Sequence, residues 1–271
     1  MNQQSLLRKF LTRLPAYLVI AFMVAPLIVV VATSFTAGNS VSFPPQGLSL
    51  RWYPIALAEQ GFLDALGRSL NIALVTTIIS VILGYIAALV LTRNEKGVRI
   101  LSMISLGPLF VASAVLGLAF LMVLSQVGLL GSYQGLLIAY TVITLPFTTR
   151  MIAGVLSGIG TEIEQVAQVY GATKFRAIRE VNFPIAAAGI FAASVYAFIN
   201  VFDESVMINF IGSVKFQTFP LLLIGHLQET YDPVASVYAT ILLAATMILV
   251  WLASKLFGLD KLSTSISGRR D

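Results

Sequence analysis

Cysteine is absent from the 271 residues, and charged residues make up only 11% of them. Without cysteine the chain forms no disulfide and no thiolate metal site, and it has no cysteine nucleophile. A soluble domain carries roughly 25% charged residues, so this chain has too few to cover a water-facing surface. Hydrophobic residues make up 58% of it. The chain must therefore expose apolar surface to lipid, which predicts an integral membrane protein.

Phosphate-binding and catalytic motifs are also absent. The sequence has no G-x-x-x-x-G-K-[ST] phosphate loop, so we do not expect the chain to bind ATP. A single histidine, His226, is too few for a histidine–carboxylate zinc site or a convincing serine–histidine–acid triad. We therefore expect no metal, no cofactor and no catalytic centre in this chain, and interpret His226 as a surface residue of a polar loop.

Six apolar stretches of about 20 residues are present, each long enough to cross a hydrocarbon core as a helix. Barrel strands are excluded because they alternate between apolar and polar residues. The sequence thus predicts an all-α protein with six transmembrane helices, at Pro15–Ser34, Ser69–Leu91, Leu101–Ser125, Leu136–Val155, Ala187–Ile211 and Ala235–Phe257. Arg150 closes the fourth stretch, where we expect it to reach for the inner interface rather than form part of a site.

Basic residues gather in one set of the loops between these stretches. Cytoplasmic loops carry an excess of lysine and arginine, which predicts that this set is cytoplasmic. Both termini, residues 1–14 and 259–271, belong to the set. Its members are Arg8, Lys9, Arg13, Arg93, Lys96, Arg99, Lys174, Arg176, Arg179, Lys261, Arg269 and Arg270, against Arg51, Arg68 and Lys215 in the other loops.

The first stretch has the basic start and apolar run of a secretory signal. The run is too long for a signal core, and no small-residue cleavage site follows it. We therefore predict that residues 15–62 form a retained first helix and an outer loop, in which Trp52 and Tyr53 lie along the interface. Residues 63–258 then form the main transmembrane domain.

The longest polar segment of the cytoplasmic set is residues 161–184, TEIEQVAQVYGATKFRAIREVNFP. Its apolar spacing predicts a short amphipathic helix that ends at Gly171, followed by a second short helix. Pro184 marks the entry to the fifth span. Two short helices joined at a glycine suit docking into a partner's groove. An ordinary amphipathic linker is the alternative interpretation.

This segment resembles the cytoplasmic loop of binding-protein-dependent ABC permeases, whose pattern is E-A-A, three residues, G, nine residues, I-x-L-P. Gly171 is followed after nine residues by Val181-Asn182-Phe183-Pro184, with Val for Ile and Phe for Leu. The residues 164–167, Glu-Gln-Val-Ala, stand where the family often has E-E-A-A, so Gln165 and Val166 depart from the pattern.

Other segments are similar to the second permease of polyamine (spermidine/putrescine) transporters. They are Leu50-Arg51-Trp52-Tyr53, Leu145-Pro146-Phe147, Phe202-Asp203-Glu204, Thr218-Phe219-Pro220, and Asp232-Pro233 leading into Ala239-Thr240-Ile241-Leu242-Leu243. Each is short, but their order and spacing agree with that family. Related permeases carry opines, aminophosphonates and other amino compounds, so the substrate stays open.

The resemblance implies a type I ABC importer permease fold in the bacterial inner membrane, with residues 161–184 as the coupling loop. It implies a heterodimer with a second permease, two cytoplasmic ATPases that bind ATP and Mg, and a periplasmic substrate-binding protein. The residues expected to take part in coupling are Glu164, Gln165, Ala167, Gln168, Gly171, Ala172, Thr173 and Pro184.

Two carboxylates, Asp203 and Glu204, lie inside the fifth predicted span. Each costs roughly 2.5 to 3.5 kcal/mol on insertion scales, so such residues usually serve function. Asn200 and Met207 share their helical face by three-and-four spacing. We expect these four residues to line a path for a cationic substrate, with a structural role at the permease interface as the alternative. An ion-coupled carrier that uses the two acids as a relay, and a membrane enzyme or scaffold, are the competing functions.

Overall fold

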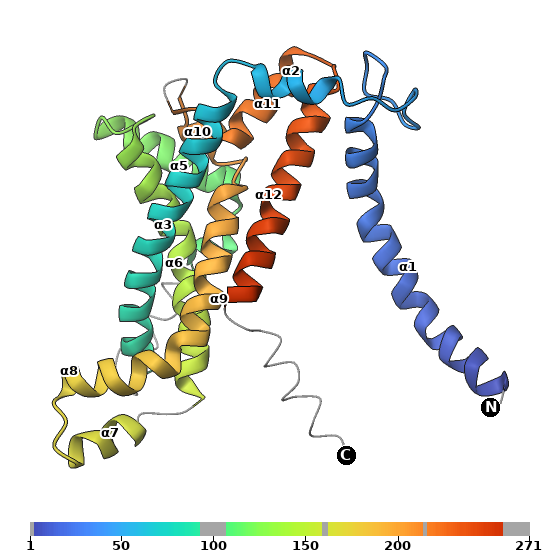
Figure 1. The fold of residues 1–271 in the computed structure, drawn as a ribbon. Coiled ribbons are helices and arrows are strands. Elements are labelled where there is room, and N and C mark those ends of the chain that lie inside the picture. Colours follow the sequence, from blue (N-terminus) through green and yellow to red (C-terminus); the bar gives the residue numbers. More distant parts are fainter. Residues whose placement is uncertain (1–2, 93–106, 159–161, 214–215, 257–271) are drawn as a thin grey trace. The chain divides into compact units, whose positions relative to one another are not determined.

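The computed structural model describes residues 3–92, 107–158, 162–213 and 216–256, and these are helical apart from their connections. The elements are α1 (Gln3–Ser34), α2 (Trp52–Ala58), α3 (Phe62–Leu91), a 3-10 turn η1 (Gly107–Phe110), α5 (Ser113–Gln126), α6 (Tyr133–Ser157), α7 (Glu162–Val169), α8 (Lys174–Ala177), a π-helical segment η2 (Ile178–Asn182), α9 (Phe183–Phe202), α10 (Ile208–Ile211), α11 (Phe219–Glu229) and α12 (Val234–Leu256). Figure 1 labels most of them.

Five helical runs in the described residues are long and apolar enough to cross a membrane: Leu14–Ser34, Phe62–Leu91, Tyr133–Ser157, Lys174–Phe202 and Val234–Leu252. They correspond to five of the six predicted stretches, which confirms the all-α membrane class. The remaining stretch, Leu101–Ser125, is described only from residue 107, where the apolar helix α5 has 14 residues. Its first part, and the basic residues 93, 96 and 99, lie outside the described residues.

The chain divides into two compact units, residues 1–62 with 223–245, and residues 63–222 with 246–271. In the first unit Tyr238 is fully buried and stacks on Phe62 at 5.5 Å between ring centroids. Its hydroxyl hydrogen-bonds to the carboxylate of Glu59. The Thr33 hydroxyl donates to Ser236 at 3.1 Å, which joins α1 to α12.

His226 also belongs to this first unit, and the prediction that it is a surface residue is wrong. Its side chain is only 13% exposed, because it sits between two carboxylates. Nε2 lies 2.8 Å from Asp232 Oδ1, and Nδ1 lies 3.6 Å from Glu59 Oε1. The histidine therefore connects the segment after α2 to the start of α12. The polar residues around His226 in the sequence predicted a surface loop, but His226 lies in the helix α11, which turns its side chain inward.

In the second unit α3, α6 and α9 pack through small residues. A Cβ on Gly189 of α9 would lie 3.1 Å from Ile152 Cα of α6. A Cβ on Gly84 of α3 would lie 2.6 Å from the Thr148 hydroxyl of α6. The Ser80 hydroxyl lies 2.6 Å from that of Thr144, a hydrogen bond between α3 and α6. Close backbone approach and small polar side chains are the usual basis of helix association in lipid.

We expect Gly189→Leu to destabilise this unit by about 1–3 kcal/mol, because the added side chain must separate α6 from α9. The matched control is Gly154→Leu on α6, where an added Cβ meets nothing within 4 Å. Thermal unfolding of the purified full chain in detergent measures the difference. Equal midpoints for the two variants would contradict the close packing at Gly189.

Candidate functional site

The predicted amphipathic helix of the cytoplasmic loop is α7, and it ends in a glycine turn. Gly171 has a φ of +92°, a conformation that favours glycine. Its N–H donates to the Gln168 carbonyl, and the Ala172 N–H donates to the Ala167 carbonyl, both at 3.0 Å. This pair of bonds is a Schellman motif, which satisfies carbonyls at the helix end. The predicted helix end at Gly171 is therefore confirmed.

The second helix of the loop is not a separate element, and this corrects the sequence interpretation. Thr173 caps α8, its hydroxyl accepting from the Arg176 N–H at 3.3 Å. From Lys174 the chain stays helical through η2 and α9 to Phe202. Figure 1 shows α8 running into α9 without a gap. Only α7 and its turn stand apart from this continuous run.

Pro184 lies inside that run, near the start of α9. Proline has no N–H for an α-helical bond, and its ring crowds the carbonyl four residues before it. Directly before it the Phe183 N–H donates to the carbonyl of Ile178, five residues back. This π-type bond opens the helix locally, an arrangement that often occurs at functional sites. The proline thus lies in the first turn of α9, as predicted for the entry to the fifth span, and directly follows a local irregularity.

Glu164 anchors α7 to the π-helical segment. The residue is 8% exposed, and its Oε2 accepts from Asn182 Nδ2 at 2.8 Å. Its Oε1 accepts from Gln168 Nε2 at 3.3 Å. Hydrogen bonds to a buried charged group contribute about 1.5–3 kcal/mol. The bond to Asn182 therefore holds α7 in a fixed place beside η2.

The same segment is braced by α3 in the second unit. Tyr85 of α3 donates its hydroxyl to the Ile178 carbonyl at 3.4 Å. Its ring also meets that of Phe183 edge-on, with centroids 5.8 Å apart. The π-helical segment η2 is thus held from two sides, by Glu164 of α7 and by Tyr85 of α3.

Several apolar side chains of the loop are exposed. Val169 is 85% exposed and Tyr170 is 88% exposed, on either side of the helix end. Exposed apolar clusters of this kind mark interaction sites. We call this surface the loop face; its members are Ile163, Val166, Val169, Tyr170 and Phe175.

The other residues predicted in the loop take varied positions. Gln165, Gln168, Gly171, Thr173 and Pro184 are exposed, while Ala167 and Ala172 are partly buried. Sequence reasoning missed Asn182, the partner of Glu164, which occupies the variable position of the I-x-L-P pattern. No periodicity relates residues 164 and 182, so only the folded structure shows this contact.

The predicted continuous fifth span is wrong around the two carboxylates. α9 ends at Phe202, and Asp203 to Met207 form a turn before α10, which we call the acidic turn. Glu204 Oε1 accepts from the N–H groups of Val206 at 2.9 Å and Met207 at 2.8 Å. The carboxylate thus satisfies two backbone donors that the interruption of the helix would leave free.

An open pocket of about 320 Å³ adjoins this turn. Its polar side chains include Asn200, Asp203 and Glu204, three of the four predicted path residues. We call it the acidic pocket; it is lined by Tyr196, Ile199, Asn200, Asp203, Glu204, Ser205 and Val206. Met207 is fully buried and does not line it. The structure thus brings together three of the four predicted residues.

A smaller pocket of about 160 Å³ shares the side chains of Tyr196, Asn200 and Glu204, and Met207 lines this one. Tyr196 was not predicted, although it precedes Asn200 by four residues and so lies on the same helical face. Its ring lies against Phe147 of α6, with centroids 4.7 Å apart. Counting back from Glu204 in steps of four residues gives Asn200 and then Tyr196, so the helical spacing could have predicted Tyr196.

Arg150 lies within α6, seven residues before the helix ends at Ser157. It lines neither pocket beside the acidic turn. Among the described residues, no group of three or more histidine, cysteine or acidic side chains is arranged to hold a metal ion.

Comparison with known proteins adds family information to this geometry. The model of the family described as binding-protein-dependent transport system inner membrane component matches residues 80–257. The spermidine/putrescine transport system permease protein PotC of Escherichia coli K12 is 26% identical over 257 residues, 93% of each chain. The sulfoquinovosyl glycerol transport system permease protein SmoH of Agrobacterium fabrum is 28% identical over 187 residues, 67% of this chain and 64% of that one.

A solved structure supports the fold. It is a bacterial alginate ABC transporter in complex with an alginate pentasaccharide-bound periplasmic protein. One chain of it superposes with a TM-score of 0.74 at 14% identity, covering 94% of both chains. At this identity the similarity shows the fold alone.

We expect Asn182→Ala to loosen α7, because the buried Glu164 carboxylate loses its neighbouring donor. Amide hydrogen exchange across residues 163–169 should then become about tenfold faster, the effect of roughly 1.4 kcal/mol. Glu180→Ala is the matched control, since it removes only the ion pair with Arg176, whose side chains are 57% and 66% exposed. Equal exchange in both variants would show that Asn182 does not anchor the helix.

Proposed function

We propose, because the chain belongs to the family of binding-protein-dependent transport system inner membrane components, that its loop face couples transport to a partner ATPase. The resemblance stated from the sequence is confirmed. The chain is a multi-pass inner membrane permease subunit of an ABC importer and is not itself an enzyme. In the proposal it works with a second permease, two ATPases that bind ATP and Mg, and a periplasmic binding protein.

The proposed topology has six spans and both termini in the cytoplasm. Five spans are the long helical runs described above, and the sixth would end with α5. The proposal puts α7 and α8 on the cytoplasmic side, which agrees with the lysine and arginine content of residues 174–179.

The observation that carries the coupling proposal is the contrast between the two sides of α7. Its inner side is fixed by the bond from Asn182 to Glu164, at 2.8 Å. Its outer side exposes Val169 and Tyr170, apolar groups that a partner would cover. A helix that binds a partner and is rigidly attached to the membrane domain transmits displacement instead of absorbing it.

The continuous helical run from α8 to α9 connects the loop to the acidic pocket. α9 has 20 residues and therefore spans about 30 Å. One end joins η2 beside α7, and the other carries Asn200 directly before the acidic turn. We propose that a displacement of the loop face moves one wall of the acidic pocket, which would alter access to the path.

The proposed substrate is a small organic cation, and a polyamine fits best. Asp203 and Glu204 bring two carboxylates to a pocket whose other polar groups are amide and hydroxyl. Such a lining attracts cations. The likeness to PotC over 93% of the chain points the same way. Opines, aminophosphonates and other amino compounds are the alternative substrates.

A secondary carrier is the competing function, with Asp203 and Glu204 as an ion relay. Glu204 already accepts two backbone N–H groups through one oxygen, so its position depends on that turn. A fixed carboxylate of this kind is suited to line a path rather than to move with a proton. Gradient-driven uptake by the purified chain alone in vesicles would favour the carrier.

Gly171→Ala tests the coupling role. A side chain at positive φ costs about 1–2 kcal/mol, so the turn after α7 should shift. We expect co-purification of the ATPase with the permease to fall about tenfold, and ATP-driven uptake to fall with it. The amount of permease in the membrane should stay unchanged. Gly128→Ala is the matched control, because Gly128 has a φ of +70° and equally open surroundings. Equal losses in both variants would assign the effect to general strain.

Asp203→Asn and Glu204→Gln test the path. Glutamine keeps the oxygen that accepts from residues 206 and 207 but removes the charge, so the turn should persist. We expect the KM for spermidine uptake to rise about tenfold in each variant, with normal assembly of the complex. Glu229→Gln, an exposed acid outside both pockets, is the control. Normal uptake in both test variants would contradict the path, and failed assembly would favour a structural role.

A further inference from the structure

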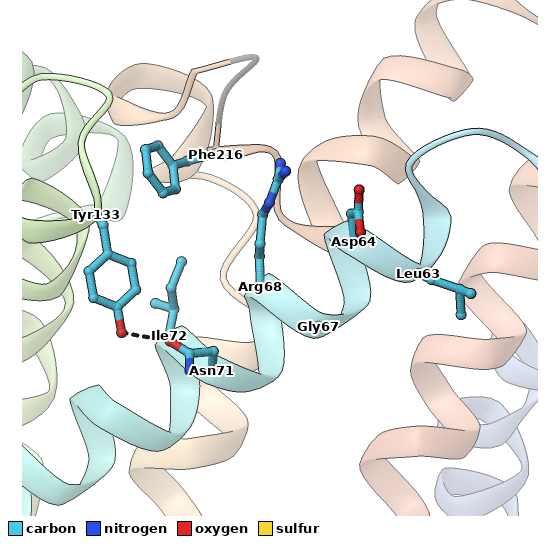
Figure 2. Close-up of a pocket in the computed structure, with 8 residues that line it drawn as sticks. All are labelled: Leu63, Asp64, Gly67, Arg68, Asn71, Ile72, Tyr133 and Phe216. Carbon is cyan, nitrogen blue, oxygen red and sulfur yellow. Dashed lines mark hydrogen bonds between the residues drawn. The ribbon is translucent and has the colours of Figure 1, made fainter.

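A separate pocket of about 420 Å³ lies on the first turns of α3 (Figure 2). Tyr133, at the start of α6, and Phe216, from the segment before α11, form its opposite wall. The two aromatic rings lie 6.3 Å apart between centroids. The full lining is Leu63, Asp64, Gly67, Arg68, Asn71, Ile72, Tyr133 and Phe216. Neither the coupling argument nor the substrate path uses these residues.

The pocket carries one positive and one negative group. Asp64 and Arg68 are one helical turn apart, and Figure 2 shows both side chains rising on the same side of α3. Within the part of the chain that the structure describes, neither makes an ion pair or a side-chain hydrogen bond. An i, i+4 pair of opposite charges that stays apart can hold an external ligand with both charges.

A fixed hydrogen bond adds polar groups to this lining. The Tyr133 hydroxyl donates to Asn71 Oδ1 at 2.6 Å, as the dashed line in Figure 2 shows. This bond occupies the amide oxygen, so the Asn71 side-chain N–H groups remain as donors toward a ligand. The segment carrying Phe216 is itself tied down, because the Phe219 N–H donates to the Ser69 hydroxyl of α3 at 2.8 Å.

The depth of the pocket follows from α3. Tyr85 contacts the Ile178 carbonyl beside α8, and the apolar run of α3 continues from there to Leu91. Asp64 precedes Tyr85 by 21 residues and Leu91 by 27 residues, which corresponds to about 31 and about 40 Å of helix. These lengths match or exceed the thickness of a hydrocarbon core. The pocket therefore lies at the opposite boundary, at the level of lipid headgroups.

An exposed apolar row continues from the pocket along α3 towards the middle of the span. Its members are Leu63, Leu70, Leu74, Ile78 and Ile82, all exposed. Their spacing of seven and then four residues keeps them on neighbouring faces of the helix. A molecule with its polar end between Asp64 and Arg68 could lay an acyl chain along this row.

We propose that the pocket binds the zwitterionic headgroup of an aminophospholipid, of which phosphatidylethanolamine is the simplest. The Arg68 guanidinium and the Asn71 amide receive the phosphate, and the Asp64 carboxylate receives the primary ammonium. Arginine suits a phosphate because its planar donors fit two oxygens. The lipid belongs to the leaflet opposite α7. That this is the outer leaflet rests on the proposed function, which puts α7 on the cytoplasmic side.

Lipid retention tests the site directly. The full chain, purified with any subunits that accompany it, is exchanged into vesicles of equal parts phosphatidylethanolamine and phosphatidylglycerol. Native mass spectrometry then counts the lipids retained. We expect the wild-type chain to retain phosphatidylethanolamine preferentially and Arg68→Gln to lower this retention about tenfold, the loss of one charge-assisted contact. Arg51→Gln is the control, since Arg51 is exposed over Trp52 outside the pocket.

Asp64→Asn separates the two halves of the headgroup. It removes the partner of the ammonium but leaves the phosphate contact, so the preference over phosphatidylglycerol should disappear while binding persists. Arg68→Lys keeps a charge and should restore part of the retention lost in Arg68→Gln, which distinguishes recognition from misfolding.

Three outcomes would overturn the site: equal retention of both lipids by the wild-type chain, unchanged retention in Arg68→Gln, or displacement of the lipid by equimolar soluble phosphoethanolamine. The last would show that the pocket takes a free phosphate ester. None of these measurements involves uptake, so failure here leaves the importer proposal standing, and failed coupling variants leave the lipid site standing.

Discussion

The structure depends on one constraint, which is that hydrocarbon offers no partner for a backbone N–H or C=O group. Every span must therefore satisfy its own backbone, and helices do so completely. Two interruptions of the helical pattern stand out in the second unit. Before Pro184 a π-type bond from Phe183 to Ile178 replaces the α-helical one. After Phe202 the Glu204 carboxylate accepts the freed N–H groups of the next turn.

Both interruptions lie at the ends of the same helix, and the proposed functions lie there too. At one end η2 presents Asn182 to the buried carboxylate of Glu164. At the other end the last two turns of the helix form part of the lining of the acidic pocket. Irregular backbone is costly inside a membrane and is tolerated where it borders protein or a water-filled cavity. In the proposed mechanism, the rigid helix between these two points links the loop face mechanically to the acidic pocket.

The helix α3 serves a different purpose at each boundary. Near its end Tyr85 braces the loop that would meet the ATPase. Near its start Asp64 and Arg68 carry the opposite charges of the proposed lipid site. A lipid headgroup bound there would hold the start of α3 at a fixed depth. The close contacts between α3 and α6, such as Gly84 against Thr148, would then hold α6 at a fixed depth in the membrane as well.

The sequence by itself determined the membrane class, five of the spans, the helix end at Gly171 and the family. These follow from short-range causes: apolar runs long enough to cross lipid, a glycine that accepts positive φ, and a spacing pattern within one segment. Tertiary structure alone decided that His226 is enclosed between Asp232 and Glu59, and that Asn182 anchors Glu164. It also decided that the fifth span breaks at Asp203. Each of these depends on which hydrogen-bond donor reaches a carboxylate in the folded chain. Helical periodicity in the sequence does not determine such pairings.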